Sequence, residues 1–235
     1  MDKLPQEQAI VVTIDGPGGS GKGTISRLLA KHLDWHLLES GALYRLLALE
    51  ADKHHVPLDD IAALTSLAET LDVQFIPDPK QEHTQFILEG EDVSNEIIQE
   101  SCGDKASQIS VYLSVRQALL AKQRSFRQMP GLVAEGRDMG TVVFPDAALK
   151  IFLSASDTER AQRRYNQLKA QGIHVSLDAL QNELKARDER DRQRVVSPLQ
   201  PAVDAIIVDT TGMDVQSVFT RILQLFDEHF NINRP

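Results

Sequence analysis

Gly16-Pro17-Gly18-Gly19-Ser20-Gly21-Lys22-Gly23-Thr24 is the stretch that decides the fold of this 235-residue chain. It follows an apolar run, residues 10–14, which predicts a buried strand. Beyond it, the apolar residues of 25–30 recur at helical spacing, and we expect a helix over residues 22–32. A glycine-rich turn between a strand and a helix is typical of a loop that binds the phosphates of a nucleotide.

Each residue type in this loop suits phosphate binding. Glycines let the backbone N–H groups turn toward phosphate oxygens and approach them closely. The positive end of the helix dipole and the ammonium group of Lys22 attract the β- and γ-phosphates. Thr24 follows Lys22 by two places instead of directly, so the hydroxyl or water that completes a magnesium shell stays open, with Thr24 as our candidate. The alternative is a flexible surface turn, which the flanking strand and helix disfavour.

Length and composition indicate a globular chain with one sizeable core and room for an inserted subdomain. The single cysteine, Cys102, excludes an internal disulfide and a cysteine-rich zinc site, and it fits a reducing, cytoplasmic compartment. We expect neither a membrane span nor a signal peptide. A net charge of −9 argues against nonspecific binding to nucleic acid. Arginines are nevertheless dense over residues 116–194, which suggests a local anion site.

A short strand over residues 35–38 is predicted to lead into Glu39-Ser40-Gly41 and then into a helix that carries Tyr44 and Arg45. Open α/β sheets bind their ligands at the edge where such strands end. The polar groups of this segment are therefore candidates for substrate binding. The alternative is that Tyr44 and Arg45 are ordinary surface residues that lie over the core.

A second short strand, over residues 132–134, is predicted to deliver Arg137 and Asp138 to the same edge. Two charges at the end of a buried strand are costly unless both have partners. Arg137 can neutralise a phosphate with two parallel hydrogen bonds, and Asp138 can accept a hydrogen bond from an exocyclic amine. A purely structural ion pair is the alternative.

Both segments resemble bacterial cytidylate kinases. Glu39-Ser40-Gly41-Ala42-Leu43-Tyr44-Arg45 is similar to the family's acid-Ser/Thr-Gly-x-x-Tyr-Arg segment, in which the usual acid is Asp. Gly-Arg-Asp-Met-Gly-Thr-Val-Val-Phe-Pro, residues 136–145, is similar to the corresponding strand end of the family. The Gly-Lys-Gly-Thr ending of the loop is common among nucleoside monophosphate kinases. These motifs keep their order and spacing over nearly the whole chain.

The resemblance implies an α/β fold. We expect a three-layer P-loop kinase fold with a central parallel sheet of about five strands, an inserted monophosphate-binding domain and a short helical lid. The predicted core comprises residues 1–40, 107–155 and 196–235. The monophosphate-binding domain, with a small α+β insertion, covers residues 41–106, and the lid covers residues 156–195.

Within the insertion, alternating residues over 73–76 and 85–90 predict two strands, joined by a turn at Pro77-Asp78-Pro79-Lys80. A single long helix is expected from Asp104 to about Gln128. The adjacent His54 and His55 invite interpretation as metal ligands. Because neighbouring helix positions point apart, we interpret both as solvated.

The lid is predicted from two polar helices, which start at a capping box, residues 156–159, and are separated near Gly172. Taken alone, the charged run 187–194 would be a solvated helix surface with salt bridges. Between strands of a kinase sheet, however, a polar helical hairpin is the expected form of a lid that brings arginines to the transferring phosphoryl group.

The implied activity is cytidylate kinase: transfer of the γ-phosphoryl group of ATP to CMP or dCMP, with Mg²⁺ as cofactor. Small-molecule substrates are the only implied partners, with neither nucleic acid nor membrane, and we expect a monomer. Lys22, Arg137, Arg160, Arg164 and Arg194 are expected to be catalytic, and residues 16–24 to bind ATP. The resemblance implies that CMP is bound by the following residues: Ser40, Tyr44, Arg45, Ser107, Arg116, Arg137, Asp138, Arg187, Asp191 and Arg194.

Two alternatives stay open from the sequence. One keeps the fold and changes the acceptor to another nucleotide or a small metabolite. The other is a nucleotide-dependent switch without an acceptor, against which Arg45, Arg137 and Asp138 speak, because a switch needs no second phosphate site.

Overall fold

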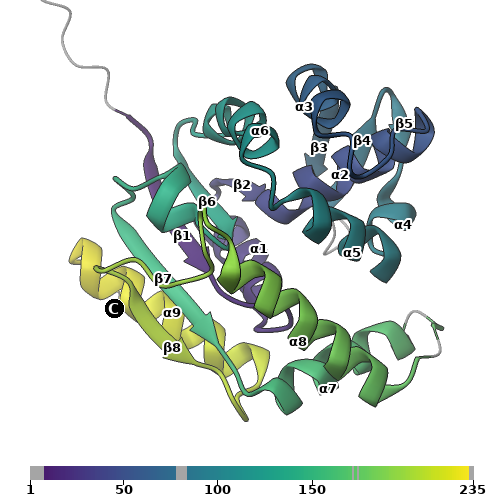
Figure 1. Ribbon diagram of the computed structural model, residues 1–235. Helices are drawn as coiled ribbons and strands as arrows, with labels where there is room; N and C mark the ends of the chain where they lie inside the picture. Colours follow the sequence, from purple (N-terminus) through teal and green to yellow (C-terminus); the bar gives the residue numbers. More distant parts are fainter. Residues whose placement is uncertain (1–7, 78–83, 171, 174, 233–235) are drawn as a thin grey trace, which may run out of the picture. The chain divides into compact units, whose positions relative to one another are not determined.

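A sheet of five strands, in the order β2-β6-β1-β7-β8, forms the centre of the first of two units in the computed structural model (Figure 1). The structure describes residues 8–77, 84–170, 172–173 and 175–232. β1 pairs in parallel with β6 and with β7, and β7 pairs in parallel with β8. The strands are β1 (Ile10–Asp15), β2 (His36–Glu39), β6 (Gly131–Gly136), β7 (Leu149–Ser154) and β8 (Ile206–Asp209). The expected α/β fold with a five-stranded parallel sheet is confirmed.

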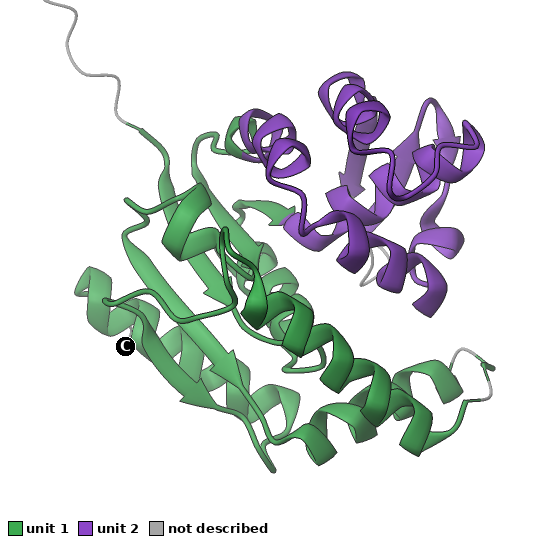
Figure 2. Ribbon diagram, viewed as in Figure 1, with its two compact units in different colours: residues 1–38, 124–235 green, residues 39–123 purple. Residues whose placement is uncertain are grey.

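This first unit comprises residues 1–38 and 124–235, and residues 39–123 form the second (Figure 2). The core of the first unit joins the sheet to α1 (Lys22–Leu33) and α9 (Val215–Phe230). Ile14, Leu29 and Ile222 are at most 2% exposed at this junction. Apolar residues at helical spacing on both helices therefore share one core with the apolar run of β1. For α1, this is what the sequence pattern predicts.

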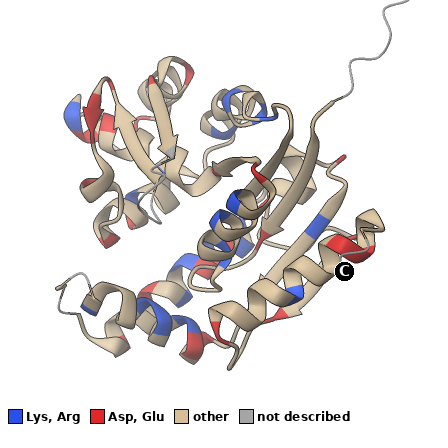
Figure 3. Cartoon of the chain, turned by 180° about the vertical axis from the view of Figure 1, so that it is seen from behind, with Lys and Arg blue, Asp and Glu red and all other residues tan. Residues whose placement is uncertain are grey.

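Two polar helices, α7 (Asp157–Ala170) and α8 (Leu177–Gln193), pack side by side in the first unit (Figure 1). The predicted cap is present, because the backbone N–H of Glu159 donates to Ser156 Oγ at 3.3 Å. Ser176 caps α8 in the same way, accepting from the N–H of Ala179 at 3.5 Å. Figure 3 shows blue and red segments interspersed along this pair, which is the charge pattern of polar helices with few buried positions.

The second unit has its own core and its own antiparallel sheet, in the order β3-β4-β5. The strands are β3 (Val73–Pro77), β4 (Thr84–Leu88) and β5 (Glu91–Asp92). Residues 78–80 of the predicted turn lie outside the described residues. The helices are α2 (Ser40–Lys53), α3 (Ile61–Thr70), α4 (Ser94–Ile97), α5 (Glu100–Ile109) and α6 (Leu113–Ser125).

The prediction of one helix from Asp104 to Gln128 is wrong, since α5 ends at Ile109 and α6 begins at Leu113. The hydroxyl of Ser110 donates back to the carbonyl of Ser107 at 2.9 Å. The carbonyl of Ser110 in turn accepts from Arg116 at 3.1 Å. Serine side chains that bond nearby backbone groups compete with the helical ladder, which explains the break.

None of the described helices is both long enough and apolar enough to cross a lipid bilayer.

Candidate functional site

The glycine-rich loop runs from the end of β1 to the start of α1 and is closely packed. At Gly16, where φ is 152°, an added Cβ would lie 2.2 Å from the carbonyl oxygen of Leu153. At Gly19, where φ is 75°, it would lie 2.9 Å from the backbone of Arg160. Larger residues at these two positions would clash with backbone atoms, so the chain can follow this path only with glycine there.

Lys22 is the first residue of α1 and is only 7% exposed. Its ammonium group donates to the carbonyl of Pro17 at 3.1 Å, which folds the side chain back over the loop. Burial, followed by the positive charge of Arg137, lowers the pKa of Lys22 to about 7. The charged form of Lys22 is therefore destabilised, and a nearby anion would stabilise it and raise its pKa again.

Ser20 Oγ is also buried in the loop and has no hydrogen-bond partner among the described residues. Thr24, the third residue of α1, is exposed. The loop therefore offers a buried hydroxyl, an ammonium group and an exposed hydroxyl around the start of one helix. This donor set suits a polyphosphate.

Four of the predicted acceptor residues come together in the first unit. Arg137, at the end of β6, donates from Nε to Asp191 Oδ2 at 2.8 Å, and Arg194 pairs with the other oxygen of Asp191. Burial favours the neutral form of Asp191, but Arg137, Arg194 and Arg187 outweigh it and lower its pKa. Both Arg187 and Asp191 act on the charge of Lys22. β6 and α8 thus supply a cluster of cations beside the phosphate-binding loop.

Asp15, the last residue of β1, is a positioning residue that the sequence analysis missed. Its carboxylate accepts from the N–H groups of Met139 and Gly140, at 2.9 and 2.8 Å. These two residues open a π-helical turn, η1 (Met139–Val143), which follows Asp138 directly. Asp15 therefore fixes the backbone that carries Arg137 and Asp138. The detectable signal was an acidic residue at the end of an apolar strand, just before the loop.

Burial raises the pKa of Asp15 to about 7, against the opposing effect of the two N–H groups. Asp138 is 3% exposed and its carbonyl accepts from Val142 and Val143, at 2.9 and 3.2 Å. Single π-helical turns of this kind occur frequently at functional sites. The turn gives the buried strand a sharp end, at which both charged residues of the predicted pair are held.

The α7 arginines have three different environments. Arg160 is 1% exposed, donates to the carbonyl of Gly18 at 2.8 Å, and pairs with Asp157 and Asp188 at 2.6 and 2.5 Å. In this structure Arg160 therefore links α7 to α8 and to the glycine-rich loop. Arg164 donates to the side chain of Gln167 at 2.8 Å. The roles expected for Arg160 and Arg164 at the γ-phosphate stay predictions.

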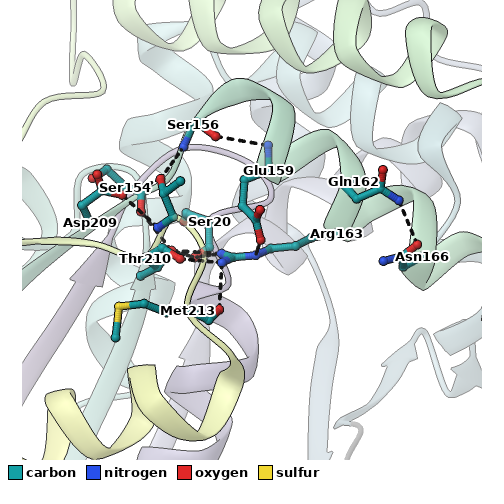
Figure 4. A network of polar contacts seen from close by, with 11 residues as sticks. Ser20, Ser154, Ser156, Glu159, Gln162, Arg163, Asn166, Asp209, Thr210 and Met213 are labelled. Atoms are coloured by element: carbon teal, nitrogen blue, oxygen red, sulfur yellow. Dashed lines mark hydrogen bonds and ion pairs between the residues drawn. The ribbon is translucent and has the colours of Figure 1, made fainter.

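Arg163 lies between these two and forms the hub of the network in Figure 4. It donates to Ser20 O at 3.4 Å, to Thr210 Oγ1 at 2.9 Å and to Met213 O at 3.2 Å, and it pairs with Glu159 at 2.9 Å. It thereby ties α7 to the loop and to the segment after β8. Arg163 is a structural connector in this arrangement.

In the second unit, the predicted base and sugar residues are buried and connected. Ser40 opens α2 and accepts from Gln123 at 3.0 Å. The guanidinium carbon of Arg116 lies 5.6 Å from the ring centre of Tyr44, within cation–π distance. Ser107 is joined to Arg116 through Ser110, although the two lie on different helices.

Arg45, the remaining predicted residue of this unit, has a more structural setting. It donates to the carbonyls of Ile97 and Gln99, at 2.5 and 3.0 Å. These carbonyls lie where α4 ends and α5 begins. Arg45 therefore fastens α2 to this junction, and its expected contact with the acceptor phosphate stays a prediction.

Known proteins agree with this set of motifs. Residues 12–228 match the family described as cytidylate kinase. The chain is 56% identical to a cytidylate kinase of Shewanella denitrificans, over 93% of this chain and 96% of that protein. It is 58% identical to one of Pseudomonas entomophila, over 92% and 94%. A cytidylate kinase of Aeromonas salmonicida is 56% identical, over 94% of each chain. The resemblance found in the sequence is confirmed, and the chain belongs to the cytidylate kinase family.

Proposed function

We infer that the chain transfers the γ-phosphoryl group of ATP to the phosphate of CMP or dCMP, giving ADP and CDP or dCDP. The acceptor phosphate is already ionised near neutral pH, so the reaction needs no general base. The protein has to hold two polyanions in line and offset the charge that spreads over the transferring group.

One observation carries this proposal. Burial, followed by the positive charges of Arg137 and Arg187, lowers the pKa of Lys22 in the loop to about 7. Arg137 and Arg194 share the single carboxylate of Asp191. Such a concentration of cations is unfavourable by itself in a chain of net charge −9, and a pair of phosphate-bearing ligands would offset it.

On the donor side, we propose that residues 16–24 hold the phosphates of ATP and that Lys22 contacts the β- and γ-phosphates. Mg²⁺ bound with ATP would neutralise part of their charge. The residues present fit this ion. Thr24 offers one exposed hydroxyl oxygen, and Mg²⁺ usually takes its other ligands from water molecules and from the phosphates of the substrate. Arg160 and Arg164 are proposed to act at the γ-phosphate.

On the acceptor side, we propose that Arg45, Arg137 and Arg194 contact the phosphate of CMP. Asp138 accepts a hydrogen bond from the N4 amine of cytosine, and Arg116 donates to N3 or O2. Uracil would place its O4 against the Asp138 carboxylate, a repulsion comparable to leaving buried polar groups unpaired. Ser40 and Tyr44 complete the base contacts, and Ser107, Arg187 and Asp191 approach the sugar.

The test is ADP release from ATP and Mg²⁺ with CMP, dCMP, UMP, AMP and shikimate as separate acceptors. We expect the highest kcat/KM with CMP or dCMP and a much lower value with the other three. Faster turnover with UMP, AMP or shikimate would assign another acceptor. ADP release that is independent of every acceptor would favour the nucleotide-dependent switch.

A further inference from the structure

A group of three potential metal ligands lies in the second unit and is not used by the proposed reaction. Glu50 and His54 lie one helical turn apart, where α2 ends, and Glu89 follows β4. One ligand atom from each residue lies within 4.8 Å of the others. The adjacent His55 is not in this group, so only one histidine of the pair interpreted as solvated is involved.

The distances suit a small cation. His54 Nε2 lies 3.7 Å from Glu50 Oε1 and 3.7 Å from Glu89 Oε1. Ligands at the usual distances around a tetrahedral zinc ion are separated by about 3.4 Å. A shift of about 0.3 Å in each of these two pairs, and a closer approach of the two carboxylates, which lie within 4.8 Å of each other, would complete three corners of a tetrahedron. A water molecule would occupy the fourth corner.

The backbone holds two of these residues in place without the ion. The N–H of His54 donates to the carbonyl of Glu50 at 3.0 Å, and the N–H of Glu89 donates to the carbonyl of Asp72 at 3.1 Å. Glu89 also has a positive φ of 50°, which is uncommon for a residue with a side chain. A site whose ligands are already ordered loses little conformational entropy on binding.

Glu50 supplies an independent indication of a ligand. Its side chain is 7% exposed, and its second oxygen, Oε2, is buried without a hydrogen-bond partner among the described residues. A buried carboxylate oxygen without a partner is costly, and a cation held by both oxygens of Glu50 would satisfy it.

The charged groups around Glu50 leave an excess of negative charge that a cation would neutralise. The groups that act on Glu50 are Glu89, His54, Lys53 and Asp72. Lys53 is committed to the far oxygen of Glu89, Oε2, at 3.0 Å and to Glu91 at 2.9 Å, so the near oxygen of Glu89 faces His54. In Figure 3, β5 beside this group is drawn in the red of acidic residues. Carboxylates outnumber fixed cations here.

We propose that Glu50, His54 and Glu89 form a site for a divalent transition-metal ion of the Zn²⁺ type. An imidazole nitrogen with two carboxylates is a ligand set that suits Zn²⁺ and disfavours Mg²⁺, which prefers oxygen ligands in an octahedron. The site links the end of α2 to the turn after β4, so that occupancy would stabilise the second unit. This inference is independent of the proposed reaction.

The test is titration of the full, nucleotide-free chain with ZnCl₂ against a chromophoric zinc indicator, in the presence of excess MgCl₂. We expect one zinc ion to bind per chain at this site and a rise in Tm with ZnCl₂. His54→Ala and Glu89→Gln should each weaken binding by at least about tenfold, as expected for removal of a direct ligand. His55→Ala is the matched control and should bind like the wild type.

Both test positions are substantially exposed, with side chains 50% and 39% accessible at His54 and Glu89. Equal Tm values of the variants and the wild type in EDTA would verify that they fold. Unchanged zinc affinity in His54→Ala, or an equal loss in His55→Ala, would overturn the proposal. Displacement of zinc by MgCl₂ would overturn the assignment to a transition metal. Because no nucleotide is present, none of these results depends on kinase activity.

Discussion

Asp15 illustrates how one buried carboxylate organises the site at the scale of single residues. Its two oxygens accept from successive N–H groups at the start of η1, which places Arg137 and Asp138. Holding a charge there is costly, and burial raises its pKa from 3.8 to about 7. The nearby Lys22 is shifted in the opposite direction, from 10.5 to about 7. Burial therefore disfavours the charged forms of two titratable groups near the loop, Asp15 and Lys22.

The first prediction is a change in pH dependence for Asp15→Asn. Between pH 3.8 and about 7, the folded chain binds more protons at Asp15 than the unfolded chain. Its free energy of unfolding should therefore fall as pH rises through this window, by at most about 1.4 kcal/mol per pH unit. Lys22 acts in the opposite direction, because its pKa is lowered in the folded chain. Its contribution to the free energy of unfolding should therefore rise between about pH 7 and pH 10.5.

Urea unfolding from pH 4 to pH 7 provides the measurement. The Asn variant should lack the part of the slope that Asp15 causes in the wild type, since the amide does not titrate. Identical slopes in both proteins would show that Asp15 has an ordinary pKa.

The second prediction concerns selectivity for the base. Asp138→Ala should lower the preference for CMP over UMP by about 10- to 100-fold, because the repulsion against O4 of uracil is removed together with the acceptor for N4. The measurement is kcat/KM for both nucleotides, with urea unfolding as the check on stability. If both kcat/KM values fall in an unchanged ratio, Asp138 does not recognise cytosine.

Several elements followed directly from local patterns, and others depended on contacts distant in sequence. The strand, loop and helix over residues 10–33 follow from apolar periodicity and glycine placement. The break between α5 and α6 was missed although its contacts are local, because the apolar spacing of this stretch does not show that Ser110 bonds Ser107 and Arg116. The turn η1 was also missed, since its stability comes from Asp15 on another strand.

The third prediction tests how α7 and α8 are joined. Asp188 pairs at 2.5 Å with Arg160, and both side chains are 2% exposed. Asp188→Asn should lower the free energy of unfolding by about 2 kcal/mol, because the buried guanidinium of Arg160 loses one of its two paired negative charges and retains that of the half-exposed Asp157. Asp178→Asn, at an exposed position of the same helix, should change it by less than about 0.5 kcal/mol. Equal effects of the two substitutions would contradict a stabilising role for the buried pair.

For the whole molecule, the charge distribution explains the kind of ligand it can bind. An acidic chain with net charge −9 repels polyanions in general. The cluster of Lys22, Arg137, Arg187 and Arg194 is a local concentration of positive charge, and Asp191 pairs with two of its arginines. The arginines could be predicted from the sequence through the family resemblance. Their shared carboxylate geometry could not, because it depends on the packing of α8 beside β6.

The central claim is that Lys22 and the glycine-rich loop bind the phosphates of ATP for transfer to CMP. Its most direct test is the rate of CDP formation from ATP and CMP by Lys22→Met. Methionine retains most of the apolar stem but removes the ammonium group. We predict a loss of kcat on the order of 10³-fold with an unchanged far-UV circular dichroism spectrum. CDP formation at the wild-type rate by the folded variant would contradict the account.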